Sequence, residues 1–250
     1  MSKHPVLGLL DHAHIPLAVL RDHFPEDFAR LAAYRSFALI RDPFSRFPSS
    51  LHERFVQRDR IPLANRASDE VAREVDEVMA QLARLPNGVP ITDPGLIHFS
   101  RQRDYVYLDG QQVVAEPRTV AEVDGMLEEL SDLVGEPILV EARRNRRFRY
   151  ASSSLMRMQL AVTRRIEKTL PRWIWKPVYV PVKQAFFATG LIQPNRDPPA
   201  ALPNAPEVDA FVREFYAGDI GLFRKLEAAR LARLVNPLPA SDKPESNPMG

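Results

Sequence analysis

The chain has 250 residues, of which 45% are hydrophobic and 26% are charged, an ordinary composition for a soluble globular protein. It has no cysteine, which excludes disulfides, thiolate metal sites and a cysteine nucleophile. No segment approaches the ~18 apolar residues of a transmembrane helix, and the N-terminal apolar stretch is too short for a signal peptide. We therefore expect a cytoplasmic protein, either free or peripheral to the inner face of the membrane.

The first part of the chain alternates helical and extended patterns. Helical spacing predicts a helix over 25–33, and the apolar run within 36–41 predicts a buried strand that an Asp-Pro pair ends. We expect the next helix to begin near Ser45 or Arg46 and to run to about residue 57.

Apolar residues at helical spacing then predict an amphipathic helix. Ser68 is its expected N-cap, and Asn87-Gly88 is its expected stop. The positions expected to face the core are Val71, Val75, Val78, Met79, Leu82 and Leu85.

Residues 104–116 predict a hairpin, because Asp109-Gly110 suits a two-residue turn between extended segments. Thr119 and Glu122 form a capping-box pattern that opens a helix over 119–134. The inward positions of this helix are expected to be Val120, Val123, Leu127, Leu130 and Val134, with Gly135 at its end.

A short buried strand is predicted over 137–141, and strands that alternate with helices favour an α/β fold with a mostly parallel sheet flanked by helices. A closing helix is predicted over 206–233. We expect one domain over 1–234, with a basic, aromatic-rich insertion at about 143–205, and a disordered tail over 235–250.

The segment that follows the 36–41 strand has the chemistry of an anion site. Arg41 lies at the carboxyl end of the strand, and Ser49 follows eight residues later near the expected helix start, with Pro48 in the first turn. A guanidinium and a helix N-terminus both favour an anionic group. The alternative is that Arg-Asp-Pro here is plain turn chemistry.

The pattern Arg-Asp-Pro-x-x-Arg-x-x-Ser, from Arg41 to Ser49, resembles the 3′-phosphate-binding segment of the carbohydrate sulfotransferases. These enzymes use 3′-phosphoadenosine 5′-phosphosulfate (PAPS). The resemblance implies that Arg41 and Ser49 hold the 3′-phosphate of PAPS, with Arg46 as structural support. It also implies a P-loop-NTPase-like three-layer fold, and no metal.

Three further segments resemble this family in the same order along the chain: 14–25, 99–105 and 215–223. One feature of the family is missing. Its members open with a glycine-containing loop that carries a lysine and binds the 5′-phosphosulfate, and residues 1–13 contain no such loop. We therefore expect that a preceding segment is missing from this sequence or that this half of the site has been lost.

Sulfuryl transfer needs a base that takes the proton of the acceptor hydroxyl. His12, His14 and His98 are the candidates, and His14 best matches the histidine that serves as base in relatives that act on sugars. The alternative is that His14 is a surface histidine with no catalytic role, whose ring nitrogens are hydrogen-bonded. The resemblance thus implies a sulfotransferase that acts on a hydroxyl of a glycan or glycolipid.

The net charge of +2 is unevenly distributed, because residues 141–183 hold 12 Lys/Arg against two acidic residues. Five arginines lie within 143–149. This run could be a solvated surface, a contact to the nucleotide or an anionic acceptor, or a site for an anionic membrane surface. The alternative function is accordingly a non-catalytic, sulfotransferase-like protein that binds a membrane or polyanion through 143–183. No motif of a nucleic-acid reader is present, so a nucleic-acid partner is not expected.

Overall fold

The computed structural model describes residues 2–11, 14–86, 88–138, 148–150, 192–194 and 202–235, together with scattered positions between 152 and 169. Its contacts group into two compact units, each built from segments that are separate along the chain. Unit 1 comprises 1–11, 44–100 and 139–215, and unit 2 comprises 12–43, 101–138 and 216–250. The single domain predicted over 1–234 stays a prediction.

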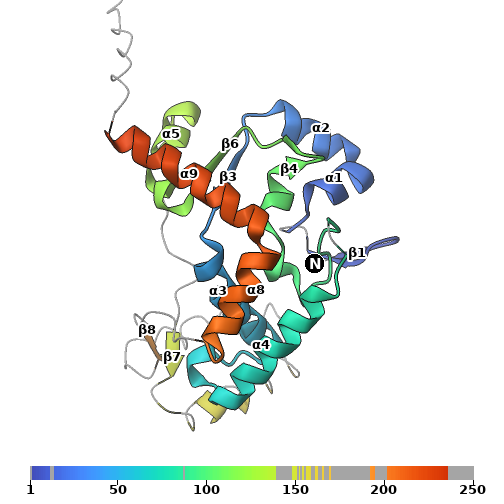
Figure 1. Cartoon of the computed structure of the whole chain (residues 1–250), viewed down its shortest axis with the longest axis vertical. Helices are drawn as coiled ribbons and strands as arrows, with labels where there is room; N and C mark the ends of the chain where they lie inside the picture. The colour runs from blue at the N-terminus through green and yellow to red at the C-terminus, as the bar shows by residue number, and fades with distance from the viewer. Residues whose placement is uncertain are drawn as a thin grey trace, which may run out of the picture. The chain divides into compact units, whose positions relative to one another are not determined.

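Unit 1 is mainly helical (Figure 1). Its described elements are β1 (Ser2–His4), β2 (Gly8–Leu10), α3 (Pro43–Asp59), η1 (Leu63–Asn65), α4 (Ser68–Ala83), η2 (Ile97–Phe99), β7 (Phe148–Tyr150), β8 (Ile192–Pro194) and α8 (Ala205–Phe215). The strands form two antiparallel pairs, β1 with β2 and β7 with β8.

The core of unit 1 lies between α3, α4 and α8. Phe47 and Phe55 of α3 are at most 1% exposed, and the Phe47 ring meets Phe99 edge-to-face with centroids 5.5 Å apart. The predicted apolar face of α4 is confirmed at four fully buried or nearly buried positions: Val71, Val75, Val78 and Leu82. Burial of these faces is the main stabilising contribution to the unit.

Two helix boundaries in unit 1 differ from the prediction. The helix expected from Ser45 or Arg46 begins at Pro43, so Pro48 lies inside α3 and not in its first turn. Proline at the first position is preorganised for a helix, which explains the earlier start. Ser68 is the first residue of α4, preceded by Ala67 at the cap position with no side-chain cap.

Unit 2 contains the parallel strand pair. Its described elements are α1 (Leu17–His23), α2 (Pro25–Ala33), β3 (Phe37–Ile40), η3 (Gln102–Tyr105), β4 (Tyr107–Leu108), β5 (Gln111–Gln112), β6 (Glu116–Thr119), η4 (Val120–Glu122), α5 (Val123–Val134) and α9 (Ala217–Val235). Strands β3 and β6 pair in parallel, and α9 packs against β6 (Figure 1). The core cluster joins Ile40, Val106, Val114 and Leu222.

Local signals in unit 2 are confirmed. Helix α2 covers 25–33, and β3 falls within the predicted 36–41. Asp109 and Gly110, with φ of 50° and 80°, make the turn between the antiparallel strands β4 and β5. The capping box at Thr119 is formed, and Gly135 ends α5 with φ of 72°. Such backbone angles suit glycine because it has no Cβ.

Three predictions for unit 2 need correction. The helix expected over 206–233 is interrupted at Tyr216 and forms two helices. The first, α8, belongs to unit 1, and the second, α9, belongs to unit 2. The helix expected over 119–134 is the 3-10 helix η4 followed by α5, and Val120 of η4 and Val134 of α5 are 42% and 61% exposed, so its inward face is narrower than expected. Of the predicted strand 137–141, residues 137 and 138 are not extended strand, and the rest lies outside the described residues.

The protein is therefore α/β with a small parallel sheet. Within the described residues one strand pair is parallel and three are antiparallel. The P-loop-like three-layer arrangement with a mostly parallel sheet stays a prediction. No helix in the part of the chain that the structure describes is both long enough and apolar enough to span a membrane.

Candidate functional site

Arg41 directly follows β3 in unit 2, and its backbone is held by one side chain. The Arg41 N–H donates to Gln102 Oε1 over 2.9 Å, and Gln102 Nε2 donates to the Arg41 carbonyl over 2.7 Å. Gln102 is only 7% exposed, so both bonds are shielded from water. The amide thus acts like one residue of a neighbouring strand and fixes the backbone at the carboxyl end of β3.

Asp219, in the first turn of α9, fixes the backbone at Gln102 in turn. Its two carboxylate oxygens accept hydrogen bonds from the N–H groups of Gln102 (2.7 Å) and Arg103 (2.9 Å). Asp219 is 1% exposed. These bonds satisfy N–H groups at the start of η3 that have no partner within that helix, and charge assistance strengthens them. Asp219 therefore links α9 to the segment that positions Arg41.

Asp104 is a second acidic group in this region. Burial is the main reason that the pKa of Asp104 is raised to about 6, and the negative charge of Asp219 raises it further. Arg101 and Arg103 act in the opposite direction. The buried Oδ2 of Asp104 has no hydrogen-bond partner among the residues that the structure describes. A carboxyl group that changes charge near neutral pH thus belongs to η3 itself, a feature common in functional sites.

The candidate bases lie in different places. His14 is in unit 2, and its carbonyl accepts a hydrogen bond from the Tyr105 hydroxyl over 3.4 Å, which brings the backbone of His14 to η3. His98 is in unit 1, where its Nε2 lies 2.6 Å from Gln57 Nε2 of α3. His12 lies outside the described residues.

Ser49 is not at a helix N-terminus, contrary to expectation. It lies in the second turn of α3, because that helix begins at Pro43, and its hydroxyl donates to the Ser45 carbonyl over 3.3 Å. Ser49 belongs to unit 1 and Arg41 to unit 2, so the predicted pair is not contained within either unit. Arg46 also lies on α3. The shared phosphate contact of Arg41 and Ser49 stays a prediction.

The structure adds Gln102, Asp104 and Asp219 to the site. These residues fall within 99–105 and 215–223, two segments discussed in the sequence analysis, where none of the three was assigned a role in the site. The basic run is almost entirely outside the described residues, where only 148–150 and scattered positions are placed. No family model, no curated protein and no solved structure matches this chain.

Proposed function

We propose that this chain is a PAPS-dependent sulfotransferase that acts on a hydroxyl group of a glycan or glycolipid. The observation that carries the proposal is the pair of hydrogen bonds between the Gln102 side-chain amide and the Arg41 backbone. These bonds fix the Arg41 backbone at the carboxyl end of the parallel strand β3. Ligands of open α/β sheets bind at the carboxyl ends of strands. A guanidinium that follows such a strand suits a nucleotide phosphate.

The connections between distant segments support the proposal. The Arg41 segment, the 99–105 segment and the start of α9 are three of the segments that carry the resemblance, and hydrogen bonds through Gln102 and Asp219 join them within unit 2. The His14 backbone contacts Tyr105 of the same region. The segments that resemble the family therefore lie in the same order along the chain and also contact one another in the fold.

The proposed reaction moves one sulfuryl group. The acceptor hydroxyl oxygen attacks the sulfur of PAPS and forms a new S–O bond. The S–O bond to the nucleotide phosphate breaks, and adenosine 3′,5′-bisphosphate leaves with that electron pair. The hydroxyl proton passes to a base, for which His14 is the proposed residue. Arg41 and Ser49 are proposed to bind the 3′-phosphate, which orients the nucleotide for in-line attack.

Calorimetry with adenosine 3′,5′-bisphosphate tests the nucleotide site. Arg41→Ala should weaken binding more than tenfold, because a charge-assisted contact contributes roughly 1.5–3 kcal/mol. Arg224→Ala is the matched control, since Arg224 is an exposed residue of α9 in the same unit. Unchanged affinity in Arg41→Ala would overturn the assignment. Binding of PAPS without turnover over a panel of sugar acceptors would instead favour a non-catalytic binding protein.

A further inference from the structure

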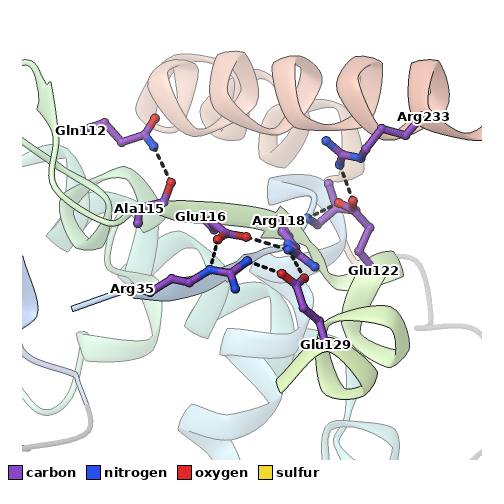
Figure 2. Close-up of polar contacts among 9 residues, drawn as sticks. Arg35, Gln112, Ala115, Glu116, Arg118, Glu122, Glu129 and Arg233 are labelled. Atoms are coloured by element: carbon purple, nitrogen blue, oxygen red, sulfur yellow. Dashed lines mark hydrogen bonds and ion pairs between the residues drawn. The ribbon is translucent and has the colours of Figure 1, made fainter. Parts of the chain in front are cut away.

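A cavity of about 480 Å³ lies in unit 2, along β6 and beneath α9. Figure 2 shows the polar groups around it, from Gln112 and Ala115 at one end of β6 to Glu122 and Arg233 at the other. A cavity of this volume suits a small organic molecule. None of the residues assigned to the nucleotide site lines it.

Two of the three carboxylates that line the cavity are held in a ring of ion pairs (Figure 2). Arg35 and Arg118 each contact both Glu116 and Glu129, with 2.6 Å between Arg118 Nη2 and Glu116 Oε2. Hydrogen bonds from Arg35 and Arg118 lower the pKa of Glu116, and those from Arg118 and Arg35 lower the pKa of Glu129. Both carboxylates are therefore ionised at neutral pH and already engaged.

The third carboxylate is engaged as well. Glu122 Oε2 accepts the Thr119 N–H over 3.0 Å as part of the capping box, and its Oε1 contacts Arg233 of α9. All three carboxylates that line the cavity therefore have protein partners. A cationic ligand would have to compete with arginines for each carboxylate, which argues against a cation as occupant.

Two cationic side chains of the cavity wall have hydrogen-bond donors that no carboxylate among the described residues uses. Arg118 is 20% exposed and uses Nη2 for both of its carboxylates, while its Nε and Nη1 make no hydrogen bond to the residues that the structure describes. Lys225 of α9 lines the same cavity, and within the described part of the chain its ammonium group has no ion pair or hydrogen bond. Unused cationic donors favour a ligand that brings acceptor oxygens and negative charge.

The same cavity has an apolar side. Leu222 and Leu226 of α9 line it, and the Tyr107 ring lies at the end near the β4–β5 hairpin. We propose that the cavity binds a small organic anion, with its phosphate, sulfate or carboxylate group on Lys225 and Arg118. Its carbon body packs against Leu222 and Leu226. This inference is independent of the proposed sulfotransferase function.

Calorimetry of the full chain with phenyl phosphate, glucose 6-phosphate and glucuronate, each up to 10 mM, tests the proposal. At least one should bind with a dissociation constant below about 1 mM, and uncharged glucose should not bind. Lys225→Gln should weaken that binding about tenfold, and Lys225→Arg should retain it, because one charge-assisted contact is lost only in the first. Arg224→Gln, which changes a neighbouring exposed charge outside the cavity wall, should have no such effect.

Two outcomes would overturn the proposal: no binding by any of the three anions, or equal affinity in Lys225→Gln and the unmodified chain. Methyl NMR of the bound complex should show shifts at Leu222 and Leu226, and shifts confined to other methyl groups would also contradict it. Arg41→Ala should leave this binding unchanged. Failure of the cavity proposal and failure of the nucleotide site are thereby distinguishable.

Discussion

Asp219 gives the sharpest test of how the site is built. Its carboxylate is 1% exposed and accepts two backbone N–H groups, at 2.7 and 2.9 Å. Asp219→Ala leaves both donors buried without a partner, and each such loss costs about 1–3 kcal/mol. Removing the charge also relieves its repulsion of the Asp104 carboxylate, which offsets part of the loss. We expect a fall in the free energy of unfolding of about 2–5 kcal/mol.

Urea denaturation at pH 7 measures this effect. Asp219→Asn keeps one acceptor oxygen, so it should lose less, about 1–3 kcal/mol. Asp132→Asn is the matched control, because Asp132 is exposed on α5 and surface changes of this kind usually stay within about 0.5 kcal/mol. If Asp219→Ala is as stable as that control, the hydrogen bonds from η3 to Asp219 of α9 do not stabilise the site.

Two further variants test the titration and the packing. The pKa of Asp104, raised from 3.8 to about 6, means that the folded state holds the proton more tightly, so stability should fall as pH rises from about 4 to 6. At pH 7.5 the free energy of unfolding of Asp104→Asn should therefore be about 1–3 kcal/mol higher than that of the unmodified chain, after allowance for partial solvent screening. Near pH 3.5 the two should differ little. A difference that does not change with pH would contradict this. Phe47→Ala removes a ring that is 1% exposed in unit 1, and thermal and urea unfolding should show a loss of about 3–5 kcal/mol, whereas a loss below about 1 kcal/mol would mean that the ring is not packed as described.

Local features of the fold could be predicted from the sequence because they depend on neighbouring residues. The Asp109-Gly110 turn needs positive φ at two successive positions, and the Thr119 capping box needs only a glutamate three residues later. The start of α3 was predicted wrongly because Pro43 and Pro48 both suit a first turn, and local rules do not choose between them.

Long-range features could not be predicted in this way. The break at Tyr216 separates α8 from α9, and the α9 residue Asp219 bonds to N–H groups more than a hundred positions away. The spacing of apolar residues over 206–233 predicts a helix but does not predict that contact. Periodicity likewise gave Val120 and Val134 an inward orientation, although packing around α5 buries only Met126.

A family pattern predicted Arg41 and His14 as site residues. It did not predict the residues that hold the Arg41 segment in place. Gln102 lies 61 positions from Arg41 along the chain, and the amide that clamps the Arg41 backbone is an ordinary polar residue in the sequence. The tertiary fold brings the two together, where η3 meets the end of β3. Ser49 was expected at a helix N-terminus because the start of α3 was predicted too late in the chain.

If Arg41 recognises the 3′-phosphate of the nucleotide, the chain should distinguish two adenine nucleotides that differ in that group. Calorimetry of the unmodified chain should give an affinity for adenosine 3′,5′-bisphosphate at least tenfold above that for adenosine 5′-monophosphate, following the strength of a charge-assisted contact. In Arg41→Ala that preference should disappear while the affinity for the monophosphate stays the same. A preference that persists in Arg41→Ala would rule out this role of Arg41.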